Sequence, residues 1–245
     1  MKLSIVLPAY NEEGSIAETI LTLYDTMLKY NIDHEIFVTN DNSKDNTAGV
    51  LLDLQKTIPS LNWETNKGPN GFGFAVRYGL DRFSGDCVAV MMADLSDDPE
   101  DLVKYYNTMI KDNVDCVFGS RWIKGGQVID YPFAKKILNR IANMIIKMVL
   151  RINYNDTTNA FKLYKKETIA GLKPFMSPHF NLTLEIPGKA IVRGYTYSVV
   201  PNSWRNRKAG ESKLKIQEMG SRYFFILMYC WLEKYFSRGD YKKKW

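Results

Sequence analysis

Short apolar runs that alternate with longer helical patterns are the feature that most restricts how this chain can fold. Runs of strand length lie at residues 4–8, 35–39, 61–64, 87–92, 115–119, 159–164 and 195–200. Helical patterns lie at residues 14–29, 47–55, 74–82, 133–152, 181–192 and 218–236, with one more beginning at Pro99. Such alternation is typical of βαβ units on a mainly parallel sheet flanked by helices. The sequence therefore predicts an α/β fold.

Composition narrows the class of protein further. The 245 residues are 45% hydrophobic and 24% charged, which is an ordinary globular composition without repeats or low-complexity segments. Cys87, Cys116 and Cys230 lie far apart without metal-ligand spacing, so we expect buried thiols rather than disulfides or a zinc site. The first four residues lead straight into a strand-like run with an internal proline, so we expect no signal peptide. No run approaches the roughly 20 apolar residues of a spanning helix. We therefore expect a protein that stays on the cytoplasmic side.

Polar side chains follow the first predicted strand directly. Pro8 ends the apolar run, and Tyr10, Asn11 and Glu12 come next, ahead of the first helix. Open α/β sheets bind ligands at the carboxyl ends of their strands. This segment is therefore a candidate binding site.

A basic loop near the other end of the sequence suits an anion. Arg207, Lys208, Ser212 and Lys213 lie within one glycine-containing stretch, where guanidinium, ammonium and hydroxyl groups can gather around a diphosphate. From residue 201 onward the chain carries eleven Lys or Arg against four acidic residues, a net charge of about +7, whereas the whole chain has +6. The rest of the protein is therefore close to neutral.

These two segments together resemble the nucleotide-holding and diphosphate-holding ends of a family 2 glycosyltransferase, closest to the branch that includes dolichol-phosphate mannose synthases. The resemblance implies a GT-A fold that binds a GDP- or UDP-sugar at the carboxyl ends of the early strands. It also implies an inverting transfer of a hexose to a polyprenyl or dolichyl phosphate. Pro8, Tyr10, Asn11 and Glu12 are then nucleotide-sugar-binding residues, and Arg207, Ser212 and Lys213 bind phosphate.

Two further loops resemble the donor-binding loops of that family. Residues 40–47 stand where the family has an acidic loop, and Asp41 is the carboxylate that would accept hydrogen bonds from base or ribose. An Asx turn that only caps the next helix is the alternative for Asp41. Gly71 and Gly73 open a helix after a strand, so their small size should let a nucleotide approach the helix N-terminus.

Asp94 is the most discriminating residue of the resemblance. Metal-dependent family members end this strand in Asp-x-Asp, whereas here the pair is Met92 and Asp94. A thioether is a poor ligand for a hard cation, so Asp94 is left as the main protein ligand for Mg²⁺ or Mn²⁺, with diphosphate oxygens and waters completing the shell. Asp97 and Asp98 are expected to complement the dipole of the following helix, and assistance to Asp94 in metal binding is the alternative.

The predicted acceptor half carries four more candidates. Ser120 and Arg121 resemble the family's Gly-Ser-Arg, and Lys162 stands where the family has an arginine, so all three are predicted phosphate-binding residues, with Arg121 also catalytic. Arg121 pairing with a structural acid is the alternative. Glu185 is the candidate general base if the acceptor is a hydroxyl, whereas an ionised phosphate needs no strong base. A paired structural acid is the alternative for Glu185.

Two amphipathic segments predict contact with a membrane surface. Residues 133–150 interleave Lys and Arg with aliphatic side chains, and residues 222–236 are rich in aromatic ones. Basic, aromatic-rich helices lie in the plane of a bilayer surface, although such helices also pack on a sheet or form a dimer seam. We expect residues 1–215 to form the glycosyltransferase domain, and residues 216–245 to form a basic aromatic helix and tail without a transmembrane helix.

Three other functions fit parts of the pattern. Transfer to a hydroxyl of a glycan in cell-surface polysaccharide synthesis would require Glu185 as base. A non-catalytic nucleotide-sugar binding protein would bind donor without turnover in the presence of Mn²⁺. Nucleic-acid binding by the basic tail is disfavoured because Asp41 and Asp94 would repel phosphates and no nucleic-acid motif is present.

Overall fold

A seven-stranded sheet forms the centre of the computed structural model, which describes residues 1–206 and 216–243, with side chains of the last helix from residue 220 onward. The strand order is β3-β2-β1-β4-β7-β5-β8. These strands are β1 (Leu3–Ala9), β2 (His34–Asn40), β3 (Leu61–Thr65), β4 (Cys87–Val90), β5 (Cys116–Ser120), β7 (Lys162–Lys165) and β8 (Tyr197–Pro201). All neighbours are parallel except β7, which is antiparallel to both β4 and β5.

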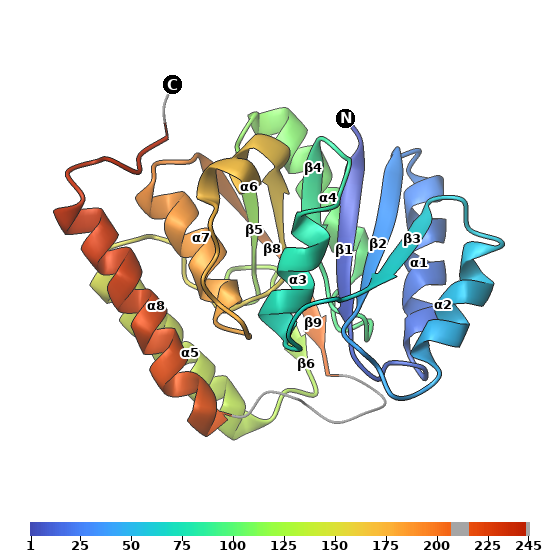
Figure 1. Cartoon of the computed structure of the whole chain (residues 1–245). Coiled ribbons are helices and arrows are strands. Elements are labelled where there is room, and N and C mark those ends of the chain that lie inside the picture. The colour runs from blue at the N-terminus through green and yellow to red at the C-terminus, as the bar shows by residue number, and fades with distance from the viewer. Residues whose placement is uncertain (207–215, 244–245) are drawn as a thin grey trace.

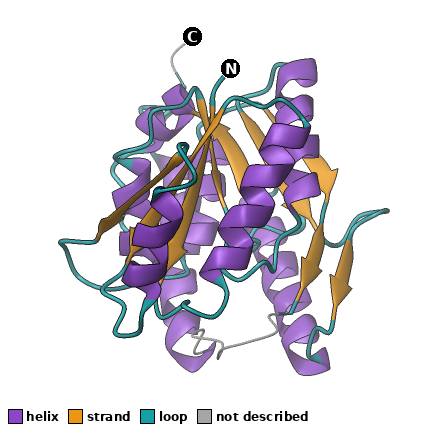
Figure 2. Ribbon diagram, turned by 90° about the vertical axis from the view of Figure 1, so that its right-hand side faces the viewer, coloured by secondary structure: helices purple, strands orange, loops and turns teal. Residues whose placement is uncertain are grey.

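Helices cover both faces of this sheet (Figures 1 and 2). They are α1 (Ile16–Lys29), α2 (Thr47–Gln55), α3 (Phe72–Leu80), α4 (Pro99–Asp112), α5 (Phe133–Leu150), α6 (Lys166–Leu172), α7 (Leu182–Val192) and α8 (Ile216–Phe236). One apolar core joins the sheet to α1, α2 and α4, and a second joins it to the other five helices. The predicted α/β fold is confirmed.

Side chains of β1 show how the pleat separates the two cores. Ile5 and Leu7 belong to the core beneath α1, α2 and α4, whereas Val6 between them belongs to the other core. Successive side chains of a strand point to opposite faces, so a strand buried on both sides is apolar throughout. The same logic explains why β4, next to β1, consists of the apolar residues Cys87–Val90 and is buried throughout.

The expected strands and helices are present, with boundaries that differ by a few residues. The structure adds three short elements that the sequence did not predict: helix α6 and a separate two-stranded parallel ribbon of β6 (Gln127–Ile129) and β9 (Ser203–Arg205). The three cysteines are buried free thiols, as expected.

Helix α8 packs against α7 and α5 (Figure 1). Ile226, Leu227 and Cys230 are buried in the core that α7 also lines. A buried ion pair joins Arg193, just after α7, to Glu233, with Nε 2.7 Å from Oε1. The last helix is therefore built into the body of the protein.

Candidate functional site

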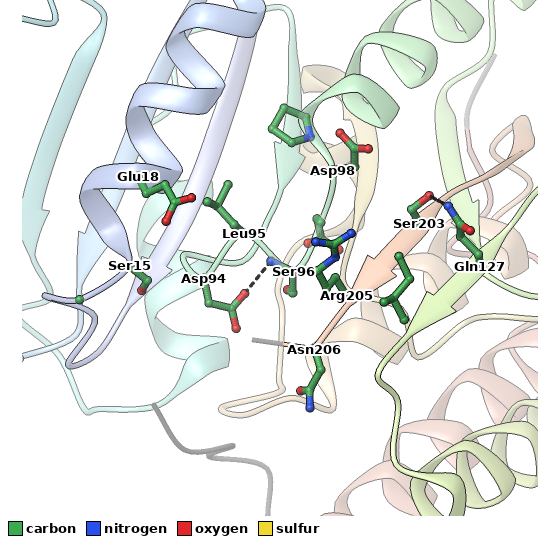
Figure 3. A pocket seen from close by; sticks show the side chains of 14 residues that line it. Ser15, Glu18, Asp94, Leu95, Ser96, Asp98, Gln127, Ser203, Arg205 and Asn206 are labelled. Atoms are coloured by element: carbon green, nitrogen blue, oxygen red, sulfur yellow. Dashed lines mark hydrogen bonds between the residues drawn. The ribbon is translucent and has the colours of Figure 1, made fainter. Parts of the chain in front are cut away.

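A cleft of about 340 Å³ lies where the chain leaves the carboxyl ends of β1 and β4, and the β6–β9 ribbon forms its far wall (Figure 3). It is lined by Gly14, Ser15, Glu18, Asp94, Leu95, Ser96, Asp97, Asp98, Pro99, Gln127, Ile129, Ser203, Arg205 and Asn206. This is the edge of the sheet at which ligands bind in open α/β folds. Of the predicted site residues, Asp94 lies in this cleft.

The loop between β4 and α4 places Asp94. The hydroxyls of Ser15 and Thr19 on the α1 side both donate to the carbonyl of Ala93, at 3.1 and 3.0 Å. The Asp94 Oδ1 accepts from the backbone N–H of Ser96 at 3.1 Å, and Leu95 between them has a positive φ of 54°. These contacts turn the Asp94 carboxylate toward the cleft (Figure 3).

Asp97 and Asp98 differ from each other in a way that the sequence did not predict. Asp98 caps α4, because its Oδ1 accepts from the N–H of Glu100 at 2.9 Å. Asp97 is instead 3% exposed and accepts from the backbone N–H of Met92 at 3.3 Å. Burial, and then the neighbouring charge of Asp94, raise the pKa of Asp97 to about 7. The expectation that Asp97 is a simple helix-start acid is therefore corrected.

Oxygen donors at the cleft fit a hard divalent cation only in part. Asp94 supplies a carboxylate and Asp97 lies nearby, whereas Met92 offers only sulfur. Within residues 1–206 and 216–243, no group of three or more acidic, His or Cys side chains could hold a metal by itself. A Mg²⁺ or Mn²⁺ ion here would therefore take most of its ligands from substrate phosphates and water, as Mg²⁺ commonly does.

The two predicted nucleotide-binding segments, which follow β1 and β2, contact each other beside the cleft. Pro8 pairs with Thr39 inside the sheet. The N–H of Asn11 donates to Ser43 Oγ at 3.0 Å, and its Oδ1 accepts from the N–H of Lys44 at 2.7 Å. Tyr10 and Glu12 flank this contact and are partly buried. The rim that follows β1 thus lies against the loop that follows β2.

Asp41 is 5% exposed and is engaged by the protein itself. Its Oδ1 accepts from Asn66 Nδ2 at 2.8 Å, and its Oδ2 accepts from the N–H of Gly71 at 2.7 Å. The carboxylate therefore ties the loops after β2 and β3 to the start of α3. It does not cap α2, so the Asx-turn alternative for Asp41 is not what the structure shows.

The glycines at the start of α3 are approached closely by another part of the protein backbone. A Cβ on Gly73 would lie 2.4 Å from the carbonyl oxygen of Ser177, and one on Gly71 would lie 2.6 Å from that of Pro178. The N–H of Gly73 donates to the carbonyl of Pro178 at 3.0 Å. The backbone that approaches these glycines in the structure is the protein's own loop before α7, and this contact requires glycine at both positions.

Arg121 and Ser120, at the end of β5, face the loop before β7. The guanidinium of Arg121 binds Asp156 through two hydrogen bonds of 2.8 and 2.7 Å, and both side chains are buried. Burial opposes the charge on Arg121, but Asp156 outweighs it and raises the pKa of Arg121 above its ordinary value. Ser120 Oγ donates to Asn155 at 2.7 Å. The structural-acid alternative for Arg121 is the one seen.

Lys162 is 1% exposed within β7, away from the lining of the cleft. Its ammonium donates to the backbone carbonyl of Thr157 at 3.0 Å and to that of Asn159. Burial lowers the pKa of Lys162 to about 7. The expectation that Lys162 presents a charge to a phosphate is therefore corrected: its ammonium holds the 157–159 turn.

Glu185 is fully buried in α7. Its Oε1 accepts from Lys189 Nζ at 2.6 Å and from the N–H of Met176 at 2.8 Å, and its Oε2 accepts from the N–H of Ser177 at 2.7 Å. The carboxylate therefore fixes the loop that packs on Gly71 and Gly73. A general base must reach the proton that it removes, so this placement favours the paired structural acid.

Arg205 is the basic residue of this lining, and the sequence did not single it out. It lies on the three-residue strand β9, which is too short to produce a recognisable pattern. Its backbone N–H donates to the carbonyl of Ser96 at 2.9 Å, and its side chain is exposed in the cleft (Figure 3). Arg207, Ser212 and Lys213, which were predicted to bind phosphate, lie outside the described residues.

The two amphipathic segments form the paired helices α5 and α8, whose outer surfaces are apolar. Exposed large side chains on them are Phe133, Ile137, Leu138, Ile141, Met144, Ile145, Met148, Phe224, Phe225, Leu232, Tyr235 and Phe236. Lys136, Arg140 and Lys147 are exposed between those of α5. None of the described helices is both long and apolar enough to cross a bilayer.

Comparison with known proteins agrees with this architecture. Residues 4–172 match the model of glycosyl transferase family 2. The chain is 33% identical over 220 residues to a dolichol-phosphate mannosyltransferase of Pyrococcus furiosus, a match that covers 88% of this chain and 60% of that protein. It is 26% identical to an undecaprenyl-phosphate mannosyltransferase of Micrococcus luteus, with 87% and 88% covered.

A solved structure shows the same fold. Glucosyl-3-phosphoglycerate synthase of Mycobacterium tuberculosis, crystallised with Mn²⁺, UDP-glucose and phosphoglyceric acid, aligns with a TM-score of 0.72 at 15% identity, covering 94% of this chain and 79% of that one. The sheet, its flanking helices and the cleft at the carboxyl ends of the strands define a GT-A fold. The chain belongs to glycosyl transferase family 2.

Proposed function

We propose that this protein transfers a hexose, with mannose the first candidate, from a GDP- or UDP-sugar to a polyprenyl phosphate at the cytoplasmic face of a membrane. The observation that carries the proposal is the cleft around Asp94, which lies at the ligand-binding edge of a GT-A sheet. The chain spans about 60% of the length of the Pyrococcus relative. The names of the relatives support the acceptor class and the sugar.

The nucleotide would lie along the rim formed by residues 10–12 and the loop at 41–47, which leads into the cleft through Gly14 and Ser15. The sugar diphosphate would then reach Asp94. Asp94 would hold a Mg²⁺ or Mn²⁺ ion, which when bound supplies positive charge to the leaving diphosphate. Asp94 is accordingly the residue on which we expect transfer to depend most.

The acceptor would be a phosphate rather than a hydroxyl. An ionised phosphate oxygen attacks the anomeric carbon from the side opposite the leaving diphosphate, which inverts the configuration and needs no strong base. This agrees with the placement of Glu185, whose oxygens are engaged in the interior. The alternative, transfer to a glycan hydroxyl, would require a base at the cleft.

Helices α5 and α8 would bring the protein to the lipid. Their exposed apolar side chains can enter the acyl boundary, and basic residues such as Lys136 and Arg140 can contact anionic headgroups. Such an association is peripheral and weakens with salt, because screening shortens the reach of these charges to about 8 Å at physiological ionic strength.

The test is incubation of the whole chain with radiolabelled GDP- and UDP-sugars, Mn²⁺ and polyprenyl phosphate in vesicles, followed by solvent extraction. We expect label in the organic phase that depends on the lipid phosphate and is absent with Asp94→Ala. Label that stays in the aqueous phase as a glycan would favour the hydroxyl acceptor. Donor binding without any turnover would identify a non-catalytic nucleotide-sugar binding protein.

A further inference from the structure

The charges that line the cleft are unequal. Glu18, Asp94, Asp97 and Asp98 contribute four acidic side chains, and Arg205 is the single basic one among the described residues that line it. An acidic cleft repels a phosphate group unless a cation intervenes. Arg205 is therefore the group in this lining that can attract an anion directly.

The backbone of β9 holds Arg205 in a fixed position. Arg205 pairs with Ile129 of β6, and its N–H donates to Ser96 in the Asp94 loop at 2.9 Å. Two residues earlier, the N–H of Ser203 donates to the buried carboxylate of Asp101 at 2.6 Å. The strand is thus attached both to α4 and to the loop that carries Asp94. In Figure 3 the Arg205 side chain is drawn between Ser96 and the pair formed by Ser203 and Gln127.

The guanidinium of Arg205 differs from the buried ones. Arg121 and Arg193 are each held by two hydrogen bonds to a carboxylate, Asp156 and Glu233 respectively. In the part of the chain that the structure describes, the Arg205 guanidinium has no such partner, and its side chain is exposed to the cleft. Its five N–H donors therefore remain available for phosphate oxygens.

We propose that Arg205 binds the diphosphate of the nucleotide sugar. Its guanidinium supplies part of the positive charge that a cation would supply if a second carboxylate at position 92 held that cation more firmly. This inference rests on the proposed function. Met92 removes one hard ligand for the cation, which leaves the ion less firmly held by the protein. A guanidinium on the facing strand offsets that loss by contacting the phosphates without a metal.

A phosphate oxygen at this position has two possible sources, the diphosphate of the donor or the phosphate of the lipid acceptor. Arg205 is bonded through its backbone to Ser96, which in turn donates to the Asp94 carboxylate. It therefore belongs with the residues assigned to the donor. We assign the diphosphate to Arg205 and use the acceptor phosphate as the competing outcome.

Calorimetric titration of the whole chain with GDP, UDP and farnesyl phosphate tests this assignment. Arg205→Gln should weaken binding of the diphosphate that the protein uses by about 10-fold to 100-fold, the range for a lost charge-assisted contact. The corresponding nucleoside monophosphate should be affected less. Lys111→Gln, an exposed charge change at the far end of α4, should leave all affinities unchanged. Thermal unfolding of both variants checks that the fold is retained.

The role of position 92 is tested by adding a second substitution. Met92→Asp in the Arg205→Gln background should restore GDP or UDP affinity in Mg²⁺ but not in EDTA, because the restored contact runs through the metal. Unchanged diphosphate affinity in Arg205→Gln, or a loss confined to farnesyl phosphate, would overturn the assignment. Lipid-linked product with unaltered diphosphate binding by Arg205→Gln would refute only this inference. Diphosphate binding that depends on Arg205 without any lipid-linked product would refute only the proposed acceptor.

Discussion

Glu185→Gln separates a structural acid from a general base. The substitution removes one charge of a fully buried pair, in which Glu185 and Lys189 are 2.6 Å apart and at most 1% exposed. It also takes away one of the oxygens that accept from Met176 and Ser177. Breaking a buried pair by removing one partner costs about 3–5 kcal/mol, because the other charge is left uncompensated. For a chain of 245 residues, at about 2–4 °C per kcal/mol, the lower figure corresponds to a fall of about 6–12 °C in Tm.

Differential scanning calorimetry measures this loss, and transfer to polyprenyl phosphate is assayed well below the lowered Tm. Turnover per folded molecule should fall less than about 10-fold, whereas loss of a general base costs about 10²-fold or more. Glu185→Gln with Lys189→Met is the matched control, because it removes both charges and should recover part of the stability. An unchanged Tm with a 10²-fold loss of turnover would show that Glu185 acts on the substrate.

Three further predictions follow from the cleft and from α5. Asp94→Ala should abolish transfer and Met92→Asp should tighten Mn²⁺ binding in a titration; near wild-type turnover of Asp94→Ala would mean that the reaction centre lies elsewhere. In EDTA, the ionised form of Asp97 is disfavoured in the folded state, so the free energy of unfolding should decline as the pH rises from the unfolded pKa of Asp97 near 4 to its folded pKa of about 7. Asp97→Asn should therefore raise the Tm more at pH 8 than at pH 5. An equal gain at both pH values would contradict this. In vesicle flotation, Lys136→Ala with Arg140→Ala should weaken low-salt binding to anionic liposomes by about 1 kcal/mol per charge. Equal flotation of the variant and the wild type would show that α5 does not contact the membrane.

The centre of the sheet could be predicted because strands such as β1 and β4 are buried on both faces, and burial leaves a continuous apolar run in the sequence. Helix α1 was predictable for the complementary reason, since Ile16, Ile20, Leu23 and Met27 recur at helical spacing and all four are buried. The antiparallel direction of β7 was not, because a strand's composition does not encode which way its neighbours run. Strands β6 and β9, of three residues each, are too short to show a period.

The candidate site was predictable where a residue's role depends on its place at the end of a strand. Asp94 follows β4 and lies in the cleft, as such a position implies. Lys162 and Glu185 were placed less well, because charged residues are usually exposed and nothing in the sequence shows the carbonyls and N–H groups that surround them. Arg205 was passed over because its importance comes from the facing loop at Ser96, which is distant in sequence.

The attachment of α8 affects how freely this chain can exchange segments with its relatives. Arg193 and Glu233 form one buried pair, and Lys243 reaches Asp115 at the start of β5, with Nζ 2.9 Å from each carboxylate oxygen. Each pair has one member before residue 200 and one after residue 230. A foreign C-terminal helix would leave Arg193 as an unpaired buried charge unless it also brought an acid at the matching position. The last helix is therefore hard to exchange by itself. A substitution on its inner face requires a compensating substitution in or just after α7.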